Sequence, residues 1–332
     1  SQVNEAFREP TTATPIVVAM ANPTNPFSED MFVLVLRDLN VSSLALSGLV
    51  CKTWKEQVDK ISAEPYWVTA MSSAATLQQA VDDVFSYCSA RAFRPNVAFL
   101  FATDDMLLES ETEETAAKML TQALKKLPRD ICLIGSTGLG IVGYDISTKS
   151  LTELEPTYPD DGVPMGARGI SLALAHVAGA SAQAYLINTK KEAETVLKQL
   201  HDMYGNATDR SVRAMIVADC RKQSDGQKLH ELISKLDTTW PSSEVTGGLA
   251  SAFKPGNSRV LFRNPSTEKV MICKGTTAML TLASNSPSGA LPLTHATVAR
   301  NFAPVGPVLR VEEVEDLLIK KISICTEHGD TG

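Results

Sequence analysis

Apolar residues recur at helical spacing near the start of the sequence. From Ser28 onward they return every three or four positions, a second such segment follows Asn40, and a third begins at Cys51. We predict three short helices that form a small module over residues 26–61. The preceding residues, 1–25, contain three prolines and show little periodicity, which predicts a flexible tail.

After residue 65 the pattern changes to short apolar runs that alternate with amphipathic segments. Strands are predicted at 66–71, 97–102, 131–135, 170–175, 184–187, 214–218, 260–262, 278–282 and 291–298, and helices at 74–91, 113–126, 190–204 and 226–236. This alternation predicts an α/β (α+β) domain with a mixed sheet over residues 66–262. In the region that follows, 270–332, the apolar spacing of residues 311–321 predicts a final helix.

Composition and charge exclude several classes of protein. The 332 residues include 31 Lys and Arg against 38 Asp and Glu, a formal net charge of -7, which opposes a broad nucleic-acid-binding surface. The longest apolar runs are far shorter than the roughly 20 residues of a membrane helix. Because residues 1–15 also lack a cationic segment ahead of an apolar one, we expect a cytoplasmic or nuclear protein.

The residue types that carry chemistry are scattered along the chain. The six cysteines form no Cys-x-x-Cys pair, so we expect reduced thiols and neither a zinc site nor a disulfide framework. No Gly-x-Ser-x-Gly elbow is present, and the acidic pairs at 104–105 and 160–161 are expected to be solvated. We therefore predict no catalytic residue, no metal and no cofactor.

One glycine motif requires a closer reading. Residues 138–143 match Gly-x-Gly-x-x-Gly, the spacing of a dinucleotide-binding loop. The residues after it alternate like a strand, whereas phosphate binding requires the N-terminus of a helix at that point. We therefore do not expect a nucleotide there.

The segment from Asp38 to Trp54 resembles the core of the F-box family. Its leucine-rich helix is followed by Leu-Val-Cys-Lys-Thr-Trp at the family's spacing, although Asn40 and Ser43 replace the usual Pro and Asp. The resemblance implies docking on a Skp-type adaptor and, through it, on a cullin-RING ligase. The implied adaptor-binding residues are Pro26, Leu36, Leu39, Leu49, Val50, Cys51 and Trp54. Cys51 is expected inside a helix as a packed thiol, and a bundle that packs only on its own chain remains the alternative.

The remainder of the chain resembles FIST domains. The matching segments, in order, are 131–141, 169–174, 247–251 and 304–307. An F-box ahead of a FIST region is the architecture of F-box FIST proteins. Because the family's C-terminal half normally continues further, we expect 270–332 to be a partial FIST C-type region. Its strands at 278–282 and 291–298 are then expected to lack sheet partners and to have unpaired edges.

Hydroxyl and glycine residues near strand ends form a candidate ligand site. They are Ser136, Thr137, Gly138, Gly247, Gly248 and Ser251. Open α/β sheets place ligands at strand ends, and glycine allows close approach to the backbone. Sharp turning and tight packing would explain the same residues equally well.

The two resemblances together imply a non-catalytic protein. The expected function is a substrate-receptor subunit of a Skp-cullin-F-box ubiquitin ligase, with the FIST region recruiting an unidentified protein substrate. The alternative is an intracellular sensory protein that binds a small ligand such as an amino acid.

Overall fold

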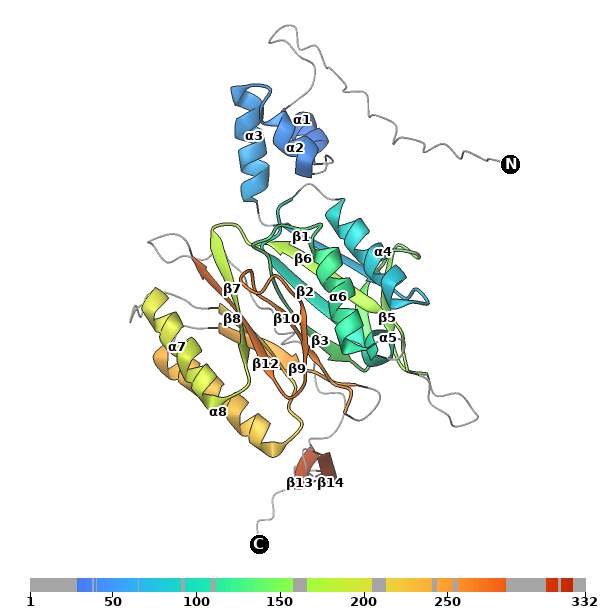
Figure 1. Cartoon of the computed structure of the whole chain (residues 1–332), viewed down its shortest axis with the longest axis vertical. Coiled ribbons are helices and arrows are strands. Elements are labelled where there is room, and N and C mark those ends of the chain that lie inside the picture. Colours follow the sequence, from blue (N-terminus) through green and yellow to red (C-terminus); the bar gives the residue numbers. More distant parts are fainter. Residues whose placement is uncertain are drawn as a thin grey trace, which may run out of the picture.

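The computed structural model describes residues 29–37, 39, 41–64, 66–90, 93–108, 112–157, 166–204, 213–240, 244–252, 256–284, 309–315 and 318–324 (Figure 1). Helices and strands are mixed along the chain, as the sequence pattern predicts. The flexible tail expected at 1–25, Pro26 and the strand expected at 291–298 lie outside the described residues.

Three short helices form the N-terminal module, as predicted. They are α1 (Glu29–Arg37), α2 (Val41–Ser47) and α3 (Lys52–Ala63). Leu36, Leu44, Val58 and Ile61 form their small buried core. Phe32 and Trp54 pack against this core with their ring centroids 4.8 Å apart. The three-helix module thus has a core of its own, which links α1, α2 and α3.

The larger sheet has eight strands in the order β11-β10-β3-β2-β6-β1-β4-β5. Their bounds are β1 (Tyr66–Ser72), β2 (Val97–Thr103), β3 (Cys132–Gly138), β4 (Ile141–Asp145), β5 (Ser150–Leu154), β6 (Ile170–His176), β10 (Val260–Arg263) and β11 (Met271–Cys273). The pairs β2/β3 and β1/β4 are parallel, whereas the other neighbours run antiparallel. The sheet is therefore mixed, as predicted.

Helices cover one face of this sheet (Figure 1). They are α4 (Leu77–Ser89), the short α5 (Asp104–Leu108) and α6 (Glu113–Leu124). The buried residues of α4 include Leu77, Val81, Val84 and Cys88, which repeat every three or four positions and form one face. Thr76 and Thr112 cap α4 and α6, since their hydroxyls accept hydrogen bonds from backbone N–H groups in the first turns.

The smaller sheet has four strands in the order β7-β12-β8-β9 and packs on the other face of the larger sheet (Figure 1). The strands are β7 (Ala180–Ile187), β8 (Arg213–Ala218), β9 (Glu244–Leu249) and β12 (Thr277–Ser284), and its outer face is covered by α7 (Lys190–Tyr204) and α8 (Gln223–Thr239). Val97, Phe99, Ile134, Val217 and Leu280 belong to the apolar layer between the sheets. Helix, sheet, sheet and helix therefore form four layers.

Two expectations for the C-terminal region are wrong. β12 has partners on both sides, because residues 277–284 pair with β7 and 277–282 pair with β8. The described residues of the helix predicted at 311–321 are strands instead: β13 (Leu309–Glu315) and β14 (Leu318–Ile324) pair antiparallel. The segment is rich in valine and isoleucine, whose branched side chains favour strands.

Candidate functional site

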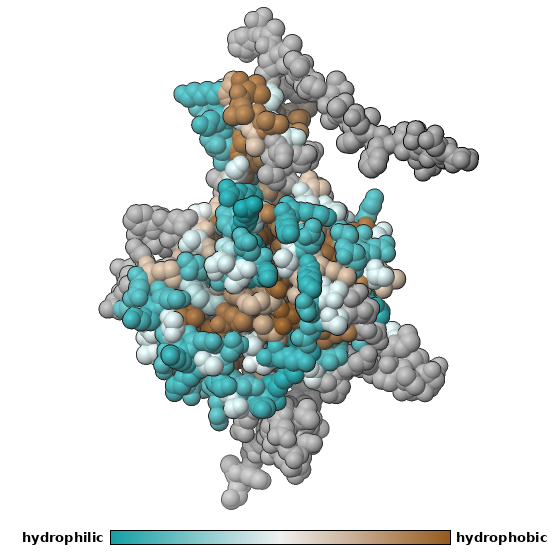
Figure 2. All heavy atoms as spheres, in the orientation of Figure 1, coloured by the Kyte–Doolittle hydropathy of each residue, from teal (hydrophilic) through white to brown (hydrophobic). Residues whose placement is uncertain are grey.

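Exposed apolar side chains mark the surface of the three-helix module. They are Met31, Leu34 and Val35 of α1, Leu46 of α2, and Leu49 and Val50 in the turn before α3, which we call the module patch. Leu49 is 81% exposed and Val50 is 63% exposed. Figure 2 shows hydrophobic surface gathered on this module. Large apolar side chains concentrated on so small a surface favour an interaction site.

The structure divides the predicted adaptor-binding residues into two groups. Leu49, Val50 and Cys51 are exposed. Leu36 is fully buried in the module core, so its assignment to the docking surface is wrong, while Leu39 and Trp54 are half-buried against that core. Of the predicted adaptor-binding residues that the structure describes, the exposed ones are therefore those between α2 and α3.

Cys51 corrects a second expectation. It does not lie inside a helix, because its extended backbone (φ -160°, ψ 171°) makes it the residue that precedes α3. Its thiol makes no capping hydrogen bond, and the residue is exposed, so it is not packed. Its carbonyl accepts a 3.0 Å hydrogen bond from the Lys55 N–H, which starts the helix.

Two hydroxyls of the predicted ligand site, those of Thr137 and Ser251, already form hydrogen bonds inside the protein. Ser136 and Thr137 are buried in β3, and Thr137 Oγ1 accepts a 2.8 Å hydrogen bond from the Arg259 N–H. Ser251 donates its N–H to the Thr137 carbonyl at 3.0 Å, and its Oγ accepts from the Leu139 N–H at 3.2 Å. Thr137 and Ser251 therefore come together, but they join β3 to the segments around residues 251 and 259.

The predicted ligand-site glycines have different surroundings. A Cβ atom on Gly247 would lie 1.8 Å from the Ile216 carbonyl oxygen, and one on Gly138 would lie 2.7 Å from the Gly140 carbonyl oxygen. At Gly248 a Cβ atom would meet nothing within 4 Å. Gly138 and Gly247 are thus explained by tight packing of the backbone.

The glycine motif at 138–143 leads into a strand, as expected. β4 begins at Ile141, inside the motif, so a strand stands where a phosphate site requires a helix N-terminus. A Cβ atom on Gly140 would lie 2.3 Å from the Leu154 carbonyl oxygen, and one on Gly143 would lie 2.8 Å from Met71 Cβ. These glycines allow β4 to pack against its neighbours.

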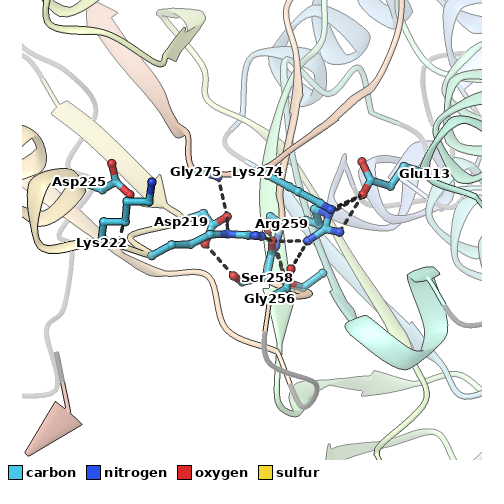
Figure 3. Close-up of polar contacts among 11 residues, drawn as sticks. Glu113, Asp219, Lys222, Asp225, Gly256, Ser258, Arg259, Lys274 and Gly275 are labelled. Carbon is cyan, nitrogen blue, oxygen red and sulfur yellow. Dashed lines mark hydrogen bonds and ion pairs between the residues drawn. The ribbon is translucent and has the colours of Figure 1, made fainter. Parts of the chain in front are cut away.

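A buried carboxylate at the end of β8 begins a polar network that the sequence analysis did not find (Figure 3). Asp219 is 2% exposed. Its two oxygens accept hydrogen bonds from Ser258 Oγ at 2.7 Å, the Gly275 N–H at 2.7 Å and Arg221 Nε at 2.8 Å. The carboxylate therefore holds three loops together at one end of the two sheets.

Arg259 continues this network towards α6 (Figure 3). Its Nε and Nη2 donate to Glu113 Oε1 at 2.9 and 2.7 Å, and its Nη1 donates to the carbonyl oxygens of Gly256 and Ser258. Lys274 Nζ lies 3.4 Å from the same glutamate oxygen. We call these residues, with Asp219 and its partners, the strand-end network; every interaction in it is internal, which indicates a structural role.

Ionisation of Glu113 should make stability depend on pH. Burial raises its pKa, but the hydrogen bonds and positive charges of Arg259 and Lys274 outweigh burial and lower the pKa below the ordinary value of 4.5. This stabilisation is complete above about pH 4.5 and is lost as the pH falls through the lower folded-state pKa. We expect the difference in unfolding free energy between wild type and E113Q to shrink below that pH, in urea titrations. A difference that stays constant down to pH 3 would contradict this.

The acidic pair at 104–105 also differs from expectation. Asp104 and Asp105 are buried in α5 instead of solvated. The other pair, at 160–161, lies outside the described residues. In the part of the chain that the structure describes, no group of three His, Cys, Asp or Glu residues could hold a metal ion.

A small cavity lies between α7 and α8, beside the ends of β7 and β8. Asp219, Gly275 and Ile187 line it with residues of both helices, and none of the six predicted ligand-site residues does. Its volume is about 30 Å³. This volume is well below the roughly 300–1,000 Å³ that is typical of sites for small organic molecules.

Local sequence gives a weak signal for the strand-end network. Asp219 directly follows an apolar strand, and Arg259 directly precedes one. A polar residue at a strand end is common, however, and only the fold brings Glu113 to Arg259 across 146 positions of sequence.

Within the described ranges, no helix combines the length and the apolar character required to cross a membrane.

Comparison with known proteins adds no family to these observations. A scan against models of known families finds no match for the chain, and a search of curated proteins finds no significant relative.

Proposed function

We propose that this chain is a non-catalytic substrate-receptor subunit of a Skp-cullin-F-box ubiquitin ligase. The three-helix module docks on a Skp-type adaptor, and the FIST-like sheet domain recruits a protein substrate. The observation that carries the proposal is the exposure of Leu49 and Val50, in the segment that resembles the F-box core.

Physical chemistry supports docking of the module. Among its described residues, four apolar side chains form the buried core, and modules of about 40 residues rarely bury enough surface to be stable alone. When a partner covers the exposed hydrophobic side chains of such a module, the burial stabilises the complex by roughly 25 cal/mol per Å² of apolar surface. Binding energy of this kind is usually concentrated in a few central side chains.

The test is adaptor capture by a variant of the exposed turn. The double variant L49D/V50D should lose co-purification with a Skp-type adaptor, because two carboxylates would be buried without partners in the interface. Far-UV circular dichroism should remain unchanged, since both side chains point into solvent in the free chain. We expect the affinity for the adaptor to fall about 100-fold or more. Each tenfold loss corresponds to roughly 1.4 kcal/mol of binding free energy.

Leu151 offers a matched control for this experiment. It is 77% exposed on β5, outside the module, so L151D places a carboxylate on a leucine of exposure similar to that of Leu49. L151D should bind the adaptor like wild type. Undiminished capture by a folded L49D/V50D variant would refute the proposed docking surface.

A further inference from the structure

An open cavity of about 460 Å³ lies at the C-terminal end of α6. Its lining residues are Thr121, Leu124, Lys125, Leu127, Arg129, Arg263, Pro265 and Glu268. Binding sites for small organic molecules typically measure about 300–1,000 Å³ and combine apolar walls with a few polar groups. This cavity has both properties, because leucine and proline side chains lie beside charged ones.

The charges that line the cavity are unequal. Lys125, Arg129 and Arg263 contribute three positive charges, and Glu268 contributes one negative charge. The local sum is +2 in a chain whose formal net charge is -7. A concentration of positive charge against the sign of the whole protein favours an anionic ligand.

Arg263 strengthens this inference because its guanidinium is buried and forms no ion pair with a described carboxylate. The residue is 5% exposed, and its Nη1 and Nη2 donate to the carbonyl oxygens of Ile131 and Arg129 at 2.7 and 3.0 Å. Its Nε has no hydrogen-bond partner, and no described carboxylate forms an ion pair with it. Burial lowers the pKa of this guanidinium below its ordinary value, although negative charges nearby oppose the shift.

Two acidic residues in this part of the protein already have partners. Asp130 lies 2.9 Å from Arg94, and Asp82 lies 3.5 Å from Lys126. Neither of them lines the cavity. The exposed side chains of Lys125 and Arg129 can therefore reach a ligand, while Arg263 adds its positive charge from the buried wall.

We propose that this cavity binds the phosphate monoester group of a small organic molecule. A phosphate monoester carries a charge of about -2 above its second pKa near 6, which matches the local charge of +2. The planar guanidinium of Arg129 suits two oxygens of one phosphate, and Lys125 supplies a further charged donor. Leu124, Leu127 and Pro265 offer apolar contacts to the organic part. This site is separate from the module patch, so the inference does not depend on the proposed function.

Calorimetric titration of the full chain with phenyl phosphate tests the proposal. Inorganic phosphate and benzoate are the comparison probes. Inorganic phosphate has the phosphate group of phenyl phosphate without its ring, and benzoate has the ring with a carboxylate in place of the phosphate. Phenyl phosphate should bind at least tenfold more tightly than either. Its affinity should fall as the pH drops below about 6, where the phosphate loses one charge.

Variants of exposed lining residues assign the binding to this cavity. K125Q/R129Q should weaken phenyl phosphate binding by about tenfold or more, and E268Q should strengthen it. Arg263 is unsuitable for the test because it also holds two backbone carbonyls. K118Q/K149Q is the matched control, since it removes two exposed charges outside the cavity.

Two results would overturn the proposal. One is undetectable binding of phenyl phosphate at millimolar concentration, or binding no tighter than that of benzoate. The other is equal binding by K125Q/R129Q and by its K118Q/K149Q control, which would place the ligand elsewhere.

Discussion

Replacing Arg259 by methionine should lower the free energy of unfolding by about 3–5 kcal/mol. The Arg259 side chain is 3% exposed and donates to Glu113 and to two backbone carbonyls. Methionine would leave the carbonyls of Gly256 and Ser258 without this donor, and Glu113 would keep only its contact with Lys274. Urea denaturation followed by circular dichroism measures the loss. A melting temperature lowered by roughly 6 °C or more should accompany it.

Arg94 provides the control for R259M. It pairs with Asp130 at 2.9 Å, but its side chain is 68% exposed, and exposed pairs contribute about 0–1 kcal/mol. R94M should therefore unfold within about 1 kcal/mol of wild type. If R259M and R94M lost the same stability, the strand-end network would not hold the two sheets together.

Gly247→Ala should destabilise the protein strongly, whereas Gly248→Ala should have little effect. The added methyl group at 247 would lie 1.8 Å from the Ile216 carbonyl oxygen, and the residue has a φ of 154°. β9 must then move away from β8, which we expect to cost about 2 kcal/mol or more. At 248 the methyl group meets nothing within 4 Å. Thermal unfolding of both variants measures the difference.

The two glycine variants also separate packing from ligand binding. Both positions belong to the candidate ligand site that the sequence suggests. Equal stability of G247A and G248A would show that the contact with Ile216 does not constrain β9. A ligand role for Gly248 would instead appear as altered binding in a variant of normal stability.

Most helices and strands could be predicted because their signals are local. Apolar periodicity identified α7 at its observed bounds, Lys190–Tyr204, and identified β1 and β2 to within one residue. Periodicity does not say which strands become neighbours. The strand predicted at 278–282 is expected to lack partners, yet β12 lies between β7 and β8, about 90 and 60 positions earlier in sequence.

The candidate sites were harder to predict than the elements. In the sequence, Leu36 and Leu49 are both apolar residues of the same predicted module. Only the packing of the three helices shows that Leu36 is in the core and Leu49 is exposed. Likewise, Thr137 and Ser251 could offer hydroxyls to a ligand until the Arg259 and Leu139 N–H groups are seen to use them. Residue type and spacing do not record which hydrogen bonds are already formed.

The short connection between α3 and β1 sets how far the three-helix module can move from the sheet domain. Only residues 64 and 65 separate Ala63 from Tyr66, and an extended chain spans at most about 3.6 Å per residue. A molecule on the module patch and another on the sheet domain are therefore kept within a limited distance of each other, with a high effective concentration. If a group were transferred from the first molecule to the second, only acceptor groups at a suitable distance from this junction could react. Distance would then limit the reaction in addition to the chemistry of the acceptor groups.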